Sequence, residues 1–147
     1  MLILTETEKA YLAGIFDGEG SVGYYLKKKT GYHRAQIAIY NSNPSIMQWL
    51  REKVGYGSIS TSKASKYTNW AWICNSKPQV IEILKSIQSY LIIKADQVDL
   101  LLEFLDAEQK DRGVGSGKRL SKEEIASRNE LQDRLKLLKT SNFQSIH

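Results

Sequence analysis

The stretch 11-YLAGIFDGEGSVGYYLKKK-29 joins an apolar run to a basic run through a cluster of glycines and two acids. Between Leu12 and Phe16 the apolar side chains have the spacing of one helix face. Aromatic and β-branched residues follow at once, which indicates a strand. Asp17 and Glu19 stand at the junction, where a helix end presents unpaired carbonyl oxygens. The stretch therefore predicts a helix that ends in a group of oxygen atoms and leads directly into a strand.

Small residues recur along the same predicted helix. Ala10, Gly14 and Gly18 lie four residues apart, so they share one helix face. Such a stripe lets another backbone approach closely. It predicts a tightly packed helix pair across a two-fold axis, or alternatively a helix packed closely on its own sheet.

Similar signals continue along the chain. Thr5 and Glu8 form a capping box at the start of the first helix, and Ser121 and Glu124 form another near the end of the chain. Helices and strands are expected, in order, as helix 5–16, strands 21–29 and 32–40, a helix from Asn43-Pro44 to Gly55, strands 57–61 and 68–75, a helix from Pro78, and helices 94–109 and 121–139. The order predicts an α+β fold of the αββαββα type, with a four-stranded antiparallel sheet, helices on one face and extra C-terminal helices.

The length and composition of the chain favour a single globular domain. A chain of 147 residues with 41% apolar and 25% charged residues can bury one core. We expect one domain over 1–147, with a core at about 5–109, a glycine-containing linker at 111–120 and a final helix at 121–139. The single Cys74 excludes a disulfide framework. No signal peptide or membrane-spanning run is evident, so we expect an intracellular protein, either of a prokaryotic cytoplasm or of an organelle.

Positive charge is concentrated in one segment. The net charge is +5, but residues 20–81 alone carry +8, with nine Lys or Arg and one acid. Both predicted hairpins fall in this segment, and their outward faces carry residue types that bind phosphates and base edges. A β-ribbon also fits the DNA major groove. The alternative is a polar sheet face that meets only water.

The segment 12-LAGIFDGEG-20 resembles the motif of the LAGLIDADG homing endonucleases. In that family the motif helix leads into a DNA-reading hairpin, and the αββαββα order follows, as predicted here for residues 5–105. One motif in about 150 residues is similar to the homodimeric branch of the family. The resemblance implies that Ala10, Gly14 and Gly18 form the contact between the motif helices of two subunits.

The same resemblance implies a metal site at the end of the motif helix. Glu19 matches the catalytic acid, and the carbonyl of Gly18 matches a further metal ligand. These oxygen ligands suit Mg²⁺, or Mn²⁺ or Ca²⁺ at the same position. Two other positions match as catalytic residues: Asn41, which would position water, and Lys94, which would stabilise charge on the phosphate. Asp17 is expected to have a structural role, capping nearby backbone amides.

The family geometry, applied through strand alternation, implies a DNA-facing surface. On the strands it comprises Tyr25, Lys27, Lys29, Tyr32, Arg34, Gln36, Ala38, Tyr40, Ser60, Ser62, Thr68, Trp70 and Trp72. The loop residues expected to meet phosphates are Lys28, Lys63 and Lys66. Trp70 and Trp72 alternate with Ala71 and Ile73, so the pattern alone allows either pair to face the core, and a one-residue shift exchanges the faces.

The resulting hypothesis is a Mg²⁺-dependent homing endonuclease. As a homodimer it would cut both strands of a long, pseudo-palindromic DNA target and leave 3′ overhangs. Two alternatives on the same fold are an intron RNA maturase and a catalytically inactive DNA-binding regulator. No membrane partner is expected.

Overall fold

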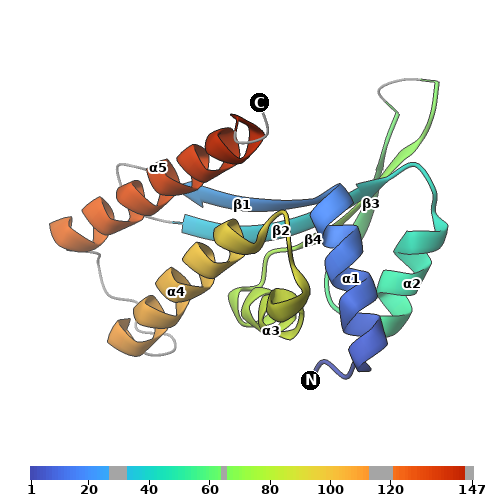
Figure 1. Ribbon diagram of the computed structural model, residues 1–147, viewed down its shortest axis with the longest axis horizontal. Coiled ribbons are helices and arrows are strands. Elements are labelled where there is room, and N and C mark those ends of the chain that lie inside the picture. The colour runs from blue at the N-terminus through green and yellow to red at the C-terminus, as the bar shows by residue number, and fades with distance from the viewer. Residues whose placement is uncertain (27–32, 64–65, 113–120, 145–147) are drawn as a thin grey trace.

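The computed structural model describes residues 1–26, 33–63, 66–112 and 121–144. Its elements are α1 (Glu6–Glu19), β1 (Gly20–Leu26), β2 (His33–Asn41), α2 (Ser45–Lys53), β3 (Ser58–Ser62), β4 (Asn69–Cys74), α3 (Lys77–Ile87), the 3-10 turn η1 (Gln88–Tyr90), α4 (Ala95–Arg112) and α5 (Lys122–Gln144). This order confirms the predicted α+β fold of the αββαββα type, followed by two C-terminal helices (Figure 1).

The first helix, α1, begins at the predicted capping box. Thr5 Oγ1 accepts the Glu8 N–H at 3.1 Å, and the Glu8 carboxylate accepts the Thr5 N–H at 3.0 Å. The helix continues through Glu19, three residues beyond the expected end. Gly20 then caps it, and a Cβ atom at Gly20 would lie 2.4 Å from the Phe16 carbonyl oxygen. Only glycine therefore allows the helix to turn directly into β1 at this point.

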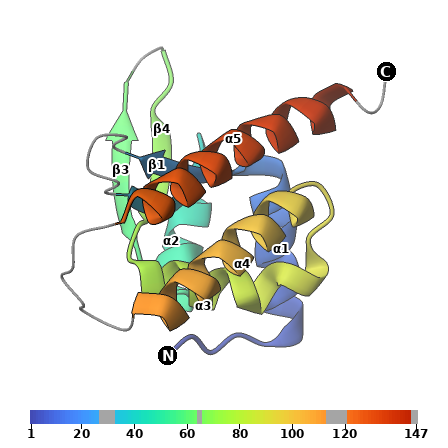
Figure 2. The same cartoon turned by 90° about the vertical axis from the view of Figure 1, so that its left-hand side faces the viewer.

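The sheet has the strand order β1-β2-β4-β3, and each neighbouring pair is antiparallel. Helices α1, α3 and α4 lie on one side of it, and α5 lies beside the edge strand β1 (Figures 1 and 2). The core forms where Val22, Ile37 and Ile39 on the strands meet buried leucines of the helices. Burial of these apolar surfaces holds the helices on the sheet and fixes where α1 ends.

The C-terminal helices pack against each other. Leu101 and Leu105 of α4 are fully buried, and Leu131 and Leu135 of α5 are nearly so. The helix α5 extends past the expected end to Gln144. None of the helices in the described ranges has the length and apolar composition that crossing a bilayer requires.

The structure corrects the predicted orientation of β4. Ile39 pairs with Trp72 and Ile37 pairs with Cys74, so Trp72 shares the core face of β2 and is 1% exposed. Trp70 lies on the same face and packs against the core. The prediction that both tryptophans face outward is wrong. The physical reason is that the indole N–H of Trp72 donates to the Tyr56 carbonyl at 2.8 Å, which allows a polar group to be buried.

The buried position of Trp72 requires a glycine at position 57. It has φ +87°, and a Cβ atom there would lie 2.6 Å from the Trp72 indole nitrogen, whereas one at Gly55 (φ +75°) would meet nothing within 4 Å. Gly55→Ala is therefore expected to cost about 1–2 kcal/mol of unfolding free energy, from the left-handed backbone alone. Gly57→Ala is expected to cost at least about 1 kcal/mol more, because it also displaces the indole. Urea unfolding of both variants measures the difference, and equal losses would refute the steric role.

Candidate functional site

The end of α1 presents one exposed carboxylate. Glu19 is the last residue of the helix, and its side chain is exposed, as is Gly18. Among the described residues, no hydrogen bond or ion pair is made by the Glu19 carboxylate. It stands at the negative end of the helix dipole, where the last carbonyls lack partners within the helix. This end of the helix is therefore a concentration of hard oxygen atoms.

Asp17 joins this helix end to a distant segment. Its side chain is 8% exposed, and its carboxylate accepts the backbone N–H groups of Ile92 at 2.8 Å and Lys94 at 3.0 Å. The Lys94 ammonium in turn donates to the Asp17 carbonyl at 2.7 Å. We call these three bonds the Asp17 clasp. The expected structural role fits this arrangement, but the amides that Asp17 caps are not local: they lie 75 and 77 residues away.

The clasp places Lys94 beside the motif helix. Lys94 immediately precedes α4, and its ammonium is partly buried. Burial lowers the pKa of Lys94, while the nearby charges of Asp17 and Glu19 act in the opposite direction. Lys94 and Glu19 thus lie within electrostatic reach of each other at one helix end. Two of the three residues that the sequence assigned to catalysis, Glu19 and Lys94, are therefore brought together although they lie far apart in the chain.

A second lysine reaches the same region from α5. The Lys139 ammonium donates to the Val22 carbonyl at 2.6 Å, across 117 residues of sequence. Burial lowers the pKa of Lys139, and the positive charge of Lys94 lowers it further. Lys139 was not predicted from the sequence, where it is one more lysine on a polar helix. Lys139 and Lys136, one turn earlier, are both exposed residues, so no local signal distinguishes them.

Asn41 lies at the end of β2 that is nearest to the start of β1. Its position is two residues beyond Ile39, which pairs with Gly20. The Asn41 side-chain oxygen accepts the Asn43 N–H at 2.8 Å, which shapes the turn into α2. This bond fixes the orientation of the side chain and uses one of the two lone pairs of the oxygen, so the amide N–H₂ and one lone pair remain for a role toward water.

The outward face of the sheet is defined by the register of the strands. Of the residues predicted to face DNA, Tyr25, Arg34, Tyr40, Ser60 and Ser62 lie on this face and are exposed, and Gln36 is partly exposed. Ala38 lies on the same face, but it is 1% exposed, so the prediction that its side chain is available there is wrong: this small residue lies between the larger Ser21 and Ile73 of the neighbouring strands.

Other predicted contact residues lie at the margins of this face. Lys63, Lys66 and Thr68 flank the strands of the second hairpin, and both lysines are exposed. The register places Asn69, Ala71 and Ile73 on the outward face of β4 where Trp70 and Trp72 were expected. Lys27, Lys28, Lys29 and Tyr32 lie outside the described residues. The outward face therefore keeps its polar and aromatic character on β1, β2 and β3, with Arg34 stacked 5.3 Å from the ring centre of Tyr25.

The small-residue stripe of α1 is open to its surroundings. Ala10, Gly14 and Gly18 are all exposed, and Cβ atoms built on either glycine would meet nothing within 4 Å. The helix packs on the sheet through the opposite side, with Leu12, Ala13 and Phe16 buried. Close packing on its own sheet therefore does not explain the stripe, and the alternative of a second helix remains.

A divalent cation would find only part of its ligands here. Mg²⁺ takes six oxygen ligands and Ca²⁺ six to eight. In the described ranges, no group of three or more His, Cys, Asp or Glu side chains could hold a metal ion. The hard oxygens at the end of α1, from the Glu19 carboxylate and the Gly18 carbonyl, fit such a cation in kind. They need further oxygens from a second copy, a phosphate or water.

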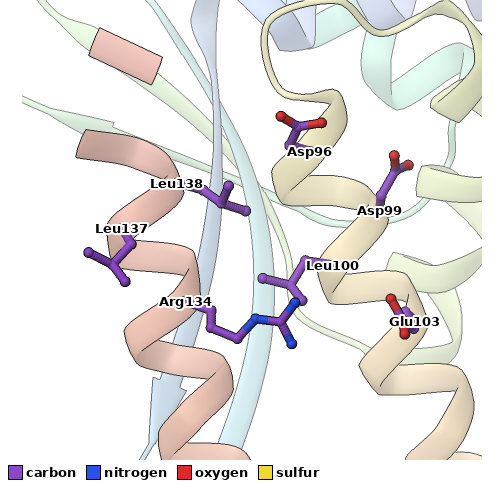
Figure 3. Close-up of a pocket in the computed structure, with 7 residues that line it drawn as sticks. All are labelled: Asp96, Asp99, Leu100, Glu103, Arg134, Leu137 and Leu138. Atoms are coloured by element: carbon purple, nitrogen blue, oxygen red, sulfur yellow. The ribbon is translucent and has the colours of Figure 1, made fainter. Parts of the chain in front are cut away.

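A hollow also lies between the C-terminal helices. It is a groove of about 470 Å³ with the acids of α4 (Asp96, Asp99 and Glu103) along one wall and Arg134, Leu137 and Leu138 of α5 along the other (Figure 3). The carboxylates stand on an exposed helix face, where water solvates them. We therefore attribute this groove to the packing of α5 on α4. The candidate catalytic groups, Glu19 and Lys94, lie instead at the end of α1.

Known proteins resemble this chain over the same part of the sequence. The family model described as LAGLIDADG endonuclease matches residues 12–104. A probable intron-encoded endonuclease, aI3 of Dictyostelium citrinum, is 29% identical over 108 residues. The match covers 69% of this chain and 44% of that protein, so the chain spans less than half the length of this curated relative.

Solved structures share the fold. The homing endonuclease I-CvuI, in complex with the I-CreI target in the presence of 2 mM Mg and with the DNA not cleaved, has a TM-score of 0.71 and 17% identity, over 90% of this chain and 82% of that chain. The LAGLIDADG meganuclease I-AabMI, bound to uncleaved DNA, has a TM-score of 0.68 and 16% identity, over 88% of this chain and 44% of that chain.

Proposed function

This chain belongs to the LAGLIDADG endonuclease family, and from this membership we propose that it is a homodimeric, metal-dependent DNA endonuclease. In this proposal it cuts both strands of a long, pseudo-palindromic target by phosphodiester hydrolysis and leaves 3′ overhangs. The observation that carries the proposal is the exposed Glu19 carboxylate at the end of α1, with Lys94 held beside it by the Asp17 clasp.

Each residue of the site has a distinct task in this proposal. Glu19 and the Gly18 carbonyl hold a Mg²⁺ ion, or Mn²⁺ or Ca²⁺ in the same place. When bound, Mg²⁺ supplies positive charge to the phosphate and makes water more acidic. The Lys94 ammonium stabilises the negative charge that develops on the phosphate oxygens. Asp17 orients Lys94 through its backbone, and the Asn41 amide orients water near the end of β2.

The outward face of the sheet supplies the recognition surface. Tyr25, Arg34, Gln36, Tyr40, Ser60 and Ser62 present hydrogen-bonding groups that suit base edges and phosphates. Lys63 and Lys66 add positive charge at the margin of this face, and the segment 27–32, with its three lysines, is proposed to add more.

Cleavage of a randomised DNA library tests the proposed activity. The purified protein is incubated with the library in Mg²⁺, and parallel reactions contain EDTA or only Ca²⁺. Sequencing of the new ends is expected to reveal one family of pseudo-palindromic sites with 3′ overhangs, formed in Mg²⁺ and absent in EDTA. Selective binding without new ends in Mg²⁺ would refute the nuclease and leave the DNA-binding regulator. Binding to intron RNA alone would favour the maturase.

The proposed dimer depends on the open stripe of α1. Because a Cβ atom at Gly14 meets nothing within the subunit, Gly14→Ala and Gly14→Leu should leave the fold of one copy intact. Gly14→Leu should still prevent close helix–helix approach, so light scattering is expected to report the mass of one chain where the unmodified protein reports two. Gln48→Leu, which adds a similar exposed side chain to α2, is the control. A dimer that survives Gly14→Leu would place the interface elsewhere.

A further inference from the structure

The end of α5 contributes to a cavity at the start of β1. The cavity has a volume of about 410 Å³, and its lining includes Ser21, Ile93, Lys94, Gln97 and Lys139. It draws residues from β1, from the segment before α4, from α4 and from α5. Among the residues that the structure describes, no carboxylate lines the cavity, and Glu19 precedes its first lining residue, Gly20. A cavity with two ammonium groups and no acid in its wall is suited to an anion.

The two lysines are held by backbone carbonyls that come before and after Glu19 in the sequence. The Lys94 ammonium donates to the carbonyl of Asp17, and the Lys139 ammonium donates to the carbonyl of Val22. Each ammonium has three N–H donors and these bonds use one of them, so each retains donors for an incoming acceptor. The backbone bonds restrict both side chains before any ligand arrives, which reduces the entropy that a ligand must overcome.

Placing two like charges together is unfavourable by itself. The positive charge of Lys94 lowers the pKa of Lys139, and the carboxylates of Asp17 and Glu19 partly offset the charge of Lys94. The repulsion is relieved when an anion lies between them. A phosphate of the DNA backbone is the anion that the proposed function brings to this cavity, which opens beside the Glu19 carboxylate.

We infer that Lys139 and Lys94 together bind one phosphate of the DNA backbone beside Glu19, so that α5 forms part of the nucleic-acid interface. This inference rests on the proposed function. Lys139 is a phosphate-binding residue in this assignment, and it reaches the site because Leu131 and Leu135 bury α5 against the core. The groove in Figure 3 belongs to the same contact, with Leu138, the residue before Lys139, facing α4.

A purely structural role for Lys139 makes different predictions. The Lys139 bond to Val22 also covers the open side of an edge strand. If that were its only task, loss of the ammonium would lower the melting temperature and leave the salt dependence of DNA binding unchanged. A phosphate contact instead releases counterions, so its loss makes the salt dependence shallower.

The test is a salt titration of binding to a short duplex of random sequence, in Ca²⁺. Lys139→Gln is compared with Lys136→Gln, which removes the same charge from the exposed surface of the same helix. The slope of log K against log salt is expected to fall by about 0.9 per copy for Lys139→Gln, which is about 1.8 for the proposed dimer. Lys136→Gln should keep the full slope, and Lys139→Arg should restore most of it. Equal slopes for the two glutamine variants would overturn the inference.

A second measurement uses the unmodified protein, in case Lys139→Gln does not fold. Amine acylation followed by mass spectrometry reports the reactivity of each lysine with and without the duplex. Lys94 and Lys139 are expected to be protected by DNA while Lys136 is not, and an unchanged Lys139 would overturn the inference. Failure of the unmodified protein to bind the duplex at low salt would instead refute the proposed function, so the two failures are distinguishable.

Discussion

The Glu19→Gln variant is expected to cleave DNA at least about 100-fold more slowly than the unmodified protein, the usual loss when one positioned catalytic group is removed. The substitution keeps the size of the side chain and removes its charge. A neutral amide is a poor ligand for a hard divalent cation, so the proposed metal site loses its only side-chain ligand from this copy. Single-turnover rates on the selected target, at saturating protein, measure the effect on the cleavage step alone.

Folding should be unaffected by this change. Glu19 is exposed, and its carboxylate makes no hydrogen bond or ion pair with the described residues. The variant is therefore expected to unfold at the same urea concentration and to bind the target in the absence of metal. Glu52→Gln, which removes a charge from the exposed surface of α2, serves as the control and should keep the full rate. Wild-type cleavage by Glu19→Gln would remove Glu19 from the catalytic centre.

The Asp17→Ala variant is expected to lose stability as well as activity. Its removal leaves the N–H groups of Ile92 and Lys94 without an acceptor at a site where Asp17 was 8% exposed. A fully buried donor left unpaired costs about 1–3 kcal/mol, and because these two bonds are partly buried, a total loss on the order of 2 kcal/mol is expected. That is a large share of the stability of an ordinary domain. Urea unfolding at constant pH measures it.

Two further variants separate the charge of Asp17 from its shape. Asp17→Asn keeps one acceptor oxygen, so its loss of stability should fall between those of the unmodified protein and Asp17→Ala. Asp133→Ala removes an exposed carboxylate from α5 and should change the unfolding free energy by less than about 0.5 kcal/mol. An Asp17→Ala variant as stable as Asp133→Ala would show that the clasp contributes nothing to the fold.

Local patterns predicted most of the architecture. The capping box of Thr5 and Glu8 marks the start of α1, and the alternation of Ala35, Ile37 and Ile39 identifies the buried face of β2. Each of these signals lies within a few residues of sequence, where the spacing of the side chains decides which face is apolar. The end of α1 was less predictable, since Asp17 and Gly18 are weak helix formers that tertiary contacts keep in the helix.

The orientation of β4 could not be read from its sequence. In 70-WAWI-73 both faces are apolar, so alternation gives no preference. The choice is made by contacts outside the strand: Trp72 finds an acceptor on Tyr56 and the space that Gly57 leaves free. Trp70, two residues away, must then lie on the same side. One side chain with a distant partner thus sets the face of a whole strand.

The parts of the candidate site that depend on distant residues were the hardest to predict. Glu19 and Lys94 were predicted from the motif and the family resemblance. Nothing in the sequence near Asp17 identifies Ile92 as its hydrogen-bond partner. Lys139 meets Val22 across 117 residues. Long-range pairs of this kind are fixed by how the helices pack, which single-sequence spacing does not encode.

The Asp17 clasp also affects when the site can exist during translation. Its hydrogen bonds join residues 75 and 77 positions apart. A growing chain that has emerged from the ribosome only through α3 contains Glu19. It lacks Ile92 and Lys94, whose N–H groups hold the end of α1 in place. Closing so long a loop costs chain entropy, which contacts of the surrounding core must offset. The nascent chain therefore carries its acidic motif well before it has the arrangement that Lys94 completes.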